Sequence, residues 1–379
     1  MQLLRQSTGK EFKLNQPENP KTSPAAQSEG KDDGLKAKSK LLWTLVFAVI
    51  AIASVSAVVL SVKSFSLSSF IGYISSASPI WLAVAILCML GYIMFEGLAL
   101  ISICRTFGHR CTLRNGFCYS AADIYFSAIT PSATGGQPAS ALLMIRDGIP
   151  GTLVTAALFL NLAMYSLSLI VIGLLCLIIR PGLLLCFSPL TIVFIVFGFV
   201  AQIFLCSFFI LLLKREQLLH GICDAVLRFL GKIHILRHVD RKRERLDRLI
   251  NEYRECVALF RGQRMMFVKV FLCNLVQRGL LIATTAITFI ACGGAVAEAL
   301  DIYSLQAYVT IGTNVLPIPG AMGITDYFLL DAFGSVMTEA QAVNLELLSR
   351  SLAFYFCVLI CGAAVLVKIF IQRKARKRK

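Results

Sequence analysis

The stretch PSATGGQP, residues 131–138, puts two prolines and two adjacent glycines in the middle of an apolar segment. Both residue types interrupt helices, because proline lacks an amide N–H and glycine has high conformational freedom. The apolar sequence on each side is too short to cross a bilayer alone, since a spanning helix needs about 20 residues. The break therefore predicts a helical hairpin whose tip lies at residues 131–138.

The chain as a whole has the composition of a polytopic membrane protein. Its 379 residues are 57% hydrophobic and 15% charged, with a mean hydropathy of +0.75, which lies outside the usual range of soluble domains. Apolar runs long enough to span a bilayer recur along the chain. We predict six full transmembrane helices at residues 41–62, 80–103, 151–178, 188–213, 266–291 and 348–371.

Both ends of the chain are polar. Residues 1–40 lack the apolar surface needed to fold, so we expect a disordered tail. A cleavable signal peptide is not expected, because the first apolar run starts late, exceeds the length of a signal core and follows three lysines. Residues 41–372 then form one transmembrane domain, and residues 373–379 form a short basic tail.

Basic residues gather in four regions: before Leu41, at residues 105–114, at residues 214–264 and in the C-terminal RKARKRK. Such clusters mark the cytoplasmic side of a membrane protein, which predicts that both termini are cytoplasmic. When the crossings are counted from there, residues 115–150 begin and end inside, whereas residues 300–345 begin and end outside.

A second break, PIPGAMGITD at residues 317–326, interrupts the segment that begins and ends outside. Irregular backbone at membrane depth survives only where protein buries it or where it lines a watery cavity. Two interrupted hairpins of opposite polarity are typical of inverted repeats with a site between the halves. The fold class that we predict is therefore all-α and polytopic, with about six full transmembrane helices plus two re-entrant broken-helix hairpins in an inverted repeat.

Ionisable side chains inside the apolar spans are the first candidates for function, because inserting one costs at least about 2.5 kcal/mol. Glu96, Arg278, Asp326 and Arg350 stand out, and Asp123 is a weaker fifth candidate. A structural interpretation stays open beside the functional one, in which Arg278 pairs with Glu96 or Asp326 only to neutralise buried charge. In that interpretation Arg350, near an interface, extends toward the membrane surface.

The hairpin tips supply the second group of candidates. Half-helices that stop at Gly135, Gly136, Gly320 or Gly323 leave N–H groups unpaired, and helix N-termini attract anions such as a lipid phosphate. Side chains that add hydrogen bonds at the tips are Thr134, Gln137 and Thr325. The alternative is that the glycines only permit close packing of helices.

Residues 214–264 alternate charges at helical spacing and carry Leu246, Ile250, Tyr253 and Val257 along one stripe. This pattern predicts an amphipathic surface helix whose basic residues rest on anionic lipid headgroups. Nucleic-acid binding is not expected, because the sequence has no nucleic-acid-binding fold.

Enzymatic and metal chemistry find little support in the sequence. Thirteen cysteines are scattered without a Cys-x-x-Cys pair, and His234 and His238, although four apart, have no acidic residue between them. The chain also lacks a Walker loop, a Gly-x-Ser-x-Gly motif and an Asp-rich cluster for metal-bound diphosphate. We therefore disfavour ATP-driven transport and the usual phospholipid transferases, and we expect no cofactor.

The two breaks in their setting resemble a known family. The order of segments resembles the transmembrane domain of the lysylphosphatidylglycerol synthase family, also called the flippase-like domain. The segments are TPSATGGQPASALLMIRDG, a long span, a basic helix and NVLPIPGAMGITDYFLL. The resemblance covers roughly residues 40–372.

Two short motifs carry most of this resemblance. They are Gly135-Gly136-Gln137, where the family often has Gly-Gly-Glu, and Pro319-Gly320-Ala321-Met322-Gly323, where the family often has Pro-Gly-Gly-Leu-Gly followed by Glu. Asp326 stands at that acidic place. The glutamine and the shorter acid are departures from the family pattern.

The resemblance implies an integral translocator for lysyl-phosphatidylglycerol or another phosphate-bearing phospholipid, in a bacterial cytoplasmic membrane. In full-length family proteins a separate soluble domain makes that lipid from aminoacyl-tRNA. Because this chain stops at Lys379, we expect the translocator half alone.

Two alternatives stay open. One is the membrane part of a phosphatidylglycerol lysyltransferase or another lipid-modifying enzyme, with a role in lipid metabolism and cationic-peptide resistance. The other is a non-transporting partner in envelope assembly. A homo-oligomer and a separate synthase chain are the protein partners that these interpretations allow.

The count of crossings predicts that the two hairpin tips open to opposite sides. In a cysteine-free variant, a cysteine at Thr134 should react with impermeant thiol reagents from the cytoplasmic face, and a cysteine at Ala321 from the outer face. Labelling of both positions from the same face would contradict the opposed hairpins.

Overall fold

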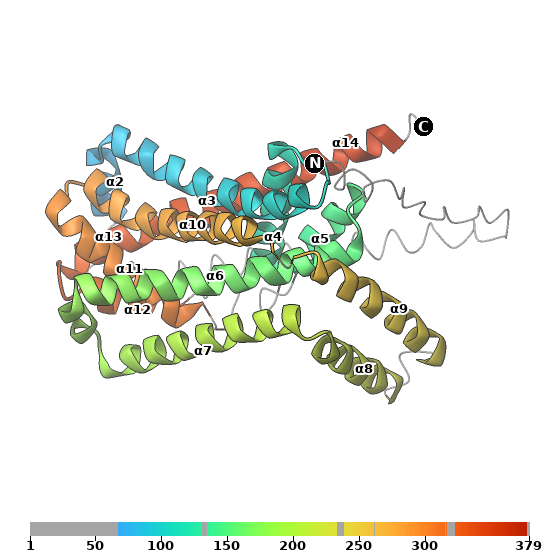
Figure 1. The fold of residues 1–379 in the computed structure, drawn as a ribbon. Helices are drawn as coiled ribbons and strands as arrows, with labels where there is room; N and C mark the ends of the chain where they lie inside the picture. The colour runs from blue at the N-terminus through green and yellow to red at the C-terminus, as the bar shows by residue number, and fades with distance from the viewer. Residues whose placement is uncertain are drawn as a thin grey trace, which may run out of the picture. The chain divides into compact units, whose positions relative to one another are not determined.

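The computed structural model describes residues 67–130, 135–232, 239–260, 262–314, 316 and 323–376. All regular elements in these ranges are helices (Figure 1). The first half of the chain contains α2 (Leu67–Ser76), α3 (Pro79–Thr106), α4 (Leu113–Ile129), α5 (Gly136–Arg146), α6 (Gly151–Ile179), η2 (Pro181–Cys186) and α7 (Pro189–Lys214).

The remaining elements are α8 (Glu216–Lys232), α9 (Val239–Ala258), α10 (Arg264–Ala291), η3 (Val296–Glu298), α11 (Ala299–Thr313), α12 (Ile324–Phe333), α13 (Glu339–Arg350), a π-helical turn (Ser351–Phe356) and α14 (Cys357–Arg376). Five helical stretches among the described residues are long and apolar enough to cross a membrane: α3, α6, α7, α10 and Glu339–Gln372. They confirm five of the predicted spans and the all-α polytopic fold class. The predicted span at residues 41–62 and the tail at residues 1–40 lie outside the described residues.

The start of the last span was predicted wrongly. The prediction placed it at residue 348, whereas the helix begins at Glu339. The added turns contain the polar residues Asn344 and Glu346, and the structure buries both inside the protein. Thr338 caps the helix, and its N–H donates to Oε1 of Gln341 at 3.2 Å.

Two short helix pairs form the hairpins. α4 packs on α5, and α11 packs on α12. Figure 1 shows the α4–α5 pair near the start of α6 and the α11–α12 pair near the last residues of α6. α5 begins at Gly136 and α12 begins at Ile324, so both helices start inside the predicted breaks.

The second hairpin is shorter than predicted. The prediction extended it over residues 300–345, but α12 ends at Phe333 and residues 339–345 belong to the last long helix. The tips themselves, residues 131–134 and 317–322, lie outside the described residues.

The helix contacts follow the pattern of the predicted inverted repeat. In the first half, α3 contacts α4, α4 contacts α5, and α5 contacts α6. In the second half, α10 contacts α11, α11 contacts α12, and α12 contacts α13. Contacts between the halves are also reciprocal, because α4 packs on α14 and α11 packs on α6. α3 and α10, which are equivalent in the two halves and have 28 residues each, share the most extensive contact among the described helices.

α3 and α4 approach each other backbone to backbone. A Cβ atom at Gly97 would lie 2.4 Å from the carbonyl carbon of Gly116, and one at Gly116 would lie 2.8 Å from the carbonyl oxygen of Gly97. These gaps are too small for any side chain, so both positions require glycine. The close contact brings the side chains of α4 within reach of Glu96 on α3.

The segment at residues 214–264 contains two helices, α8 and α9, which pack against each other beyond the end of α7 (Figure 1). The predicted apolar stripe lies partly on α9, where Ile250 and Tyr253 are buried, although the side chain of Leu246 is outside the description. The hydroxyl of Tyr253 donates to the carbonyl oxygen of Leu212 at 3.3 Å. α9 therefore packs its apolar stripe on the membrane bundle.

Replacing Gly97 with alanine tests the contact between α3 and α4. The added Cβ meets backbone atoms that have no side chain to yield, so we expect a loss of about 1–3 kcal/mol and a lower unfolding temperature in detergent. Gly221→Ala on α8 is the control, because nothing lies within 4 Å of its Cβ position and alanine favours helices. Equal unfolding temperatures for the two variants would contradict the contact.

Candidate functional site

Glu96 lies on α3 in the interior of the helix bundle and is 5% exposed. Its Oε2 accepts a hydrogen bond from the hydroxyl of Ser120 on α4 at 2.9 Å and one from Nε2 of Gln277 on α10 at 3.0 Å. A buried carboxyl is costly unless hydrogen bonds compensate its lost hydration. Glu96 therefore ties together three helices that belong to both halves of the repeat.

Asp123 lies one turn beyond Ser120 on the same helix, so it also faces α3. Asp123 accepts from Nε2 of Gln137 on α5 at 2.7 Å and from the hydroxyl of Ser127 at 3.4 Å. Glu96 and Asp123, called the carboxyl pair below, thus lie on adjacent helices and accept hydrogen bonds from neutral donors.

Gly136 lets the start of α5 lie directly against Asp123. A Cβ atom at Gly136 would lie 2.1 Å from Oδ1 of Asp123 and 2.0 Å from the hydroxyl oxygen of Ser127. The N-terminus of a helix favours negative charge, so the end of α5 that was predicted to attract an anion already faces a carboxyl group of the protein. The N–H of Gly135 donates to the hydroxyl of Thr130 at 2.9 Å.

Arg278 follows Gln277 on α10 and is 8% exposed. The central carbon of its guanidinium lies 3.8 Å from the ring centroid of Tyr165 on α6 and 5.2 Å from that of Tyr92 on α3. None of the ion pairs among the described residues includes Arg278, and its Nε has no hydrogen-bond partner there. Its partners are thus neutral aromatic residues rather than a carboxylate.

Further hydrogen bonds extend this polar region along α6. The hydroxyl of Tyr165 donates to Oδ1 of Asn314 after the end of α11. One turn away, Nδ2 of Asn274 on α10 donates to Oδ1 of Asn161 on α6 at 2.9 Å. The central polar site is therefore enclosed by α3, α4 and α5, by α6, and by α10 and the end of α11.

A second polar cluster lies at the other hairpin. Asp326 forms an ion pair with Arg350, and Arg350 also lies 3.7 Å from the carboxylate of Glu346. Oδ2 of Asp326 accepts the N–H of Gly323 at 2.9 Å, which closes the start of α12. Gly323 has a φ of +82°, a left-handed conformation that glycine adopts without strain. The π-helical turn begins directly after Arg350.

The structure thus divides the predicted residues into two groups. Glu96, Asp123, Gly136 and Gln137 meet at the carboxyl pair, next to Arg278, and Gly135 precedes α5. Gly323, Asp326 and Arg350 form the second cluster, with Thr325 half-buried on the first turn of α12. Thr134, Pro319 and Gly320 lie outside the described residues.

Two contacts bear on the structural interpretation of the charged residues. No ion pair among the described residues joins Arg278 to Glu96 or Asp326, and the rings of Tyr92 and Tyr165 lie against its guanidinium instead. Arg350 does not extend toward a membrane surface, since its helix begins eleven residues earlier than Arg350 and its side chain is 9% exposed.

Sequence analysis missed the neutral members of the site. They are Tyr92, Ser120, Asn161, Tyr165, Asn274 and Gln277. A search restricted to ionisable residues passes over amides and hydroxyls, although a glutamine or asparagine inside an apolar span is itself a signal of a buried polar contact. Nothing in the sequence distinguishes the two tyrosines from interfacial ones.

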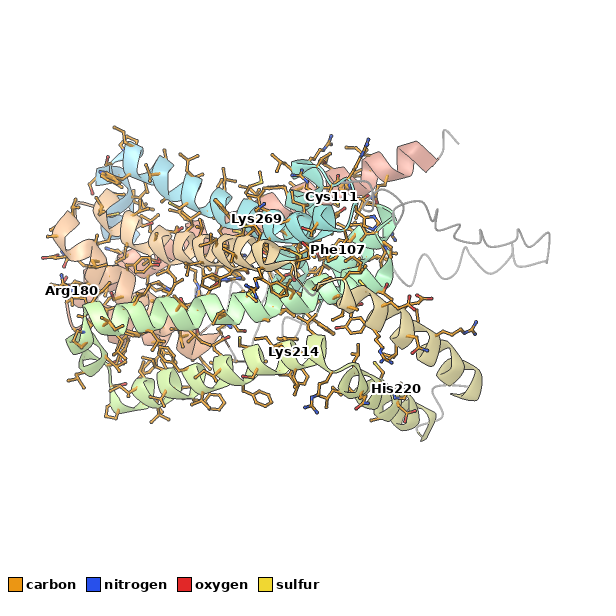
Figure 2. The ribbon with its side chains drawn as sticks, in the orientation of Figure 1. Phe107, Cys111, Arg180, Lys214, His220 and Lys269 are labelled. Atoms are coloured by element: carbon orange, nitrogen blue, oxygen red, sulfur yellow. The ribbon has the colours of Figure 1, made fainter. Side chains whose placement is uncertain are left out.

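A cavity of about 780 Å³ lies where α6, α7, α9 and α10 meet. Its walls are mainly apolar, including Leu160 and Met164 of α6, and its basic residues are Lys214, Arg254 and Arg264. Figure 2 shows Lys214 where α7 ends. Burial raises the pKa of Tyr253, which also lines the cavity, so its hydroxyl stays neutral. In the part of the chain that the structure describes, no group of three or more His, Cys, Asp or Glu residues is placed to hold a metal ion.

The second cluster predicts unequal effects of two substitutions. Arg350→Leu leaves the carboxylates of Asp326 and Glu346 without their cation, so we expect a loss of about 3–5 kcal/mol of stability. Asp326→Asn keeps Glu346 beside Arg350 and should cost less. Thermal unfolding in detergent measures both, and a larger effect of Asp326→Asn would contradict the arrangement.

A family model described as the lysylphosphatidylglycerol synthase TM region matches residues 43–361 of the chain. The match includes both hairpins, the carboxyl pair, Arg278 and the ion pair between Asp326 and Arg350. A comparison with curated proteins found no match. Because the matched residues make up most of the chain, the protein belongs to the family of the lysylphosphatidylglycerol synthase transmembrane region.

Proposed function

We propose that this protein is a phospholipid translocator and that Arg278 binds the phosphate of the lipid headgroup. The proposal rests on one observation: a guanidinium inside a membrane bundle has two tyrosine rings as partners and no carboxylate. A buried charge is costly unless it is paired and hydrogen-bonded. An anionic ligand that reaches Arg278 supplies the hydrogen-bond acceptor that its Nε lacks among the described residues.

Phosphate suits this position chemically. The arginine side chain has five N–H donors in a planar fork that matches phosphate oxygens, and its faces stack on aromatic rings. The rings of Tyr92 and Tyr165 lie against the guanidinium, and its Nε, without a partner among the described residues, can donate to an anion. Charge-assisted hydrogen bonds of this kind are stronger than neutral ones.

The architecture supports transport rather than static binding. The two hairpins lie toward opposite ends of α6 (Figure 1). The halves share their most extensive contact between α3 and α10, and Arg278 lies on α10. In transporters built from inverted repeats, rocking of one half against the other exposes a central site to each side in turn. The arginine at the contact between the halves is placed for such a site.

The 780 Å³ cavity suits a lipid at the level of one leaflet. Its apolar walls match acyl chains, and Lys214, Arg254 and Arg264 match the phosphate of a headgroup. By the distribution of basic residues this is the cytoplasmic end of the bundle. Leu160 and Met164 of α6 line the cavity, and their sequence neighbours Asn161 and Tyr165 belong to the central site. The same part of α6 therefore lines both the cavity and the central site.

The substrate that we propose is lysyl-phosphatidylglycerol or another phosphate-bearing lipid, in a bacterial cytoplasmic membrane with both termini in the cytoplasm. The description of the matching family names a synthase, which favours a second candidate, the membrane part of a phosphatidylglycerol lysyltransferase. Incubation of the purified chain with aminoacyl-tRNA and phosphatidylglycerol separates the two, because only an enzyme forms the lysylated lipid.

Arg278→Leu tests the role of Arg278. In proteoliposomes containing fluorescent phosphatidylglycerol or its lysyl derivative, we expect flipping to fall by about tenfold to a hundredfold, since hydrogen bonds to charged groups contribute about 1.5–3 kcal/mol. The variant should unfold at the same temperature or a higher one, because it removes a buried cation without an ionised partner.

Lys269→Leu is the matched control for this experiment, since Lys269 is an exposed cation on the same helix (Figure 2). Its flipping rate should stay close to that of the wild type. Flipping by Arg278→Leu at the control rate would remove Arg278 from the mechanism.

A further inference from the structure

The central site contains buried amide oxygens that the proposed phosphate contact does not use. Asn274 and Gln277 of α10 are both completely buried. Among the described residues, Oδ1 of Asn274 and Oε1 of Gln277 have no hydrogen-bond donor. A buried acceptor without a donor is costly, so these two oxygens favour a ligand that brings hydrogen-bond donors into the site.

The structure fixes the direction in which both amides face. Nδ2 of Asn274 donates to the carbonyl oxygen of Val270 and to Oδ1 of Asn161, each at 2.9 Å. A backbone carbonyl only accepts, so the nitrogen of Asn274 lies on that side and its oxygen on the other. Nε2 of Gln277 donates to Oε2 of Glu96 at 3.0 Å, and a reversed amide would place oxygen against oxygen. Neither side chain satisfies its oxygen by turning over.

Both amides lie next to the guanidinium that we propose binds phosphate. Asn274 and Arg278 are four residues apart on α10, so their side chains are neighbours on one face of the helix. That face meets α6, where Asn274 bonds to Asn161 and Arg278 lies against Tyr165, one turn further along. Gln277 directly precedes Arg278, and both side chains reach α3. The three side chains therefore belong to one region of the central site.

The polar groups of this region are complementary to part of a phospholipid headgroup. Nε of Arg278 is a donor for a phosphate oxygen, and the two amide oxygens are acceptors about one helical turn away. In ethanolamine and glycerol headgroups, a short carbon chain joins the phosphate to an ammonium group or to hydroxyl groups, which donate hydrogen bonds. A choline headgroup has the same phosphate and the same charge as ethanolamine but no N–H. The amide oxygens therefore distinguish headgroups by their donors.

We propose that Asn274 and Gln277 select phospholipids whose headgroup carries a hydrogen-bond donor, hydroxyl or ammonium, beyond the phosphate. This selectivity rests on the proposed function, because it places the phosphate at Arg278. A headgroup without a donor leaves both oxygens buried and unpaired. A site that bonds a substrate donor rejects analogues lacking it more strongly than an apolar pocket does. The cation thus binds the phosphate, whereas neutral residues choose among phosphate-bearing lipids.

Binding of short-chain lipids tests the selectivity without a flipping assay. Dihexanoyl phosphatidylglycerol, phosphatidylethanolamine and phosphatidylcholine are added to the purified protein in detergent, and the rise in unfolding temperature reports binding. The hydroxyl-bearing and ammonium-bearing lipids should bind about tenfold to a hundredfold more tightly than phosphatidylcholine. The monomethyl and dimethyl derivatives of phosphatidylethanolamine, which lose one N–H at each step, should fall between.

Gln277→Met and Asn274→Leu test the two residues separately. Each variant should reduce the preference for phosphatidylethanolamine over phosphatidylcholine by about tenfold and leave phosphatidylcholine binding unchanged, whereas loss of a purely structural contact would weaken all lipids alike. Glu96 keeps its hydrogen bond from Ser120 in Gln277→Met. Gln306→Met on α11 is the control, because it also removes an amide oxygen without a partner among the described residues, and its Nε2 donates to Thr310 of the same helix. The control should keep the preference.

Two results would overturn the selectivity. The first is equal binding of phosphatidylethanolamine and phosphatidylcholine by the wild type, which would mean that water alone satisfies the amide oxygens. The second is an unchanged preference in both variants. A protein that shows the preference but flips no lipid would reject translocation and still support the headgroup site, whereas binding of none of the lipids would reject both proposals.

Discussion

The backbone contact between α3 and α4 at Gly97 and Gly116 is the constraint on which the central site depends. Without it, the side chains of α4 stand a full side-chain layer away from Glu96, and Ser120 does not reach its carboxyl. Gly136 plays the same part between the two arms of the hairpin, where the start of α5 touches Asp123. Small residues at helix contacts are the usual means of bringing membrane helices together. Here they also bring Ser120 of α4 within hydrogen-bonding distance of Glu96.

The charged residues inside the bundle are accommodated in different ways. Arg350 has carboxylates, and Lys368 near the end of α14 has Asp147 at 2.8 Å. Glu96 has neutral donors. Arg278 has the aromatic rings of Tyr92 and Tyr165. Ion pairs that are complete within the protein have little capacity for a ligand, so Arg278 and the carboxyl pair are the places where a ligand changes the balance of charge.

The sequence alone predicts the features that depend on local residue composition, namely the helix breaks and the apolar spans. Proline and glycine identified both breaks, and hydropathy located the five spans that the structure describes. It failed at the start of the last span, which it placed at residue 348. The helix begins at Glu339, and its polar residues Asn344 and Glu346 are buried in the protein. The partners of Arg278 were equally out of reach, because Tyr92 and Tyr165 are far from it in sequence and aromatic residues are common in any apolar span.

The two hairpins solve one physical problem with different chemistry. Each has a helix that begins inside the bundle, where its first N–H groups have no water to bond. At α12, Asp326 accepts the N–H of Gly323, and the pairing of Asp326 with Arg350 fixes that end to the last long helix. At α5, Thr130 accepts the N–H of Gly135, and the adjacent acid, Asp123, accepts from the side chains of Gln137 and Ser127. The start of α12 is therefore fixed by an ion pair, whereas the start of α5 is fixed by neutral hydrogen-bond donors and by the close approach at Gly136.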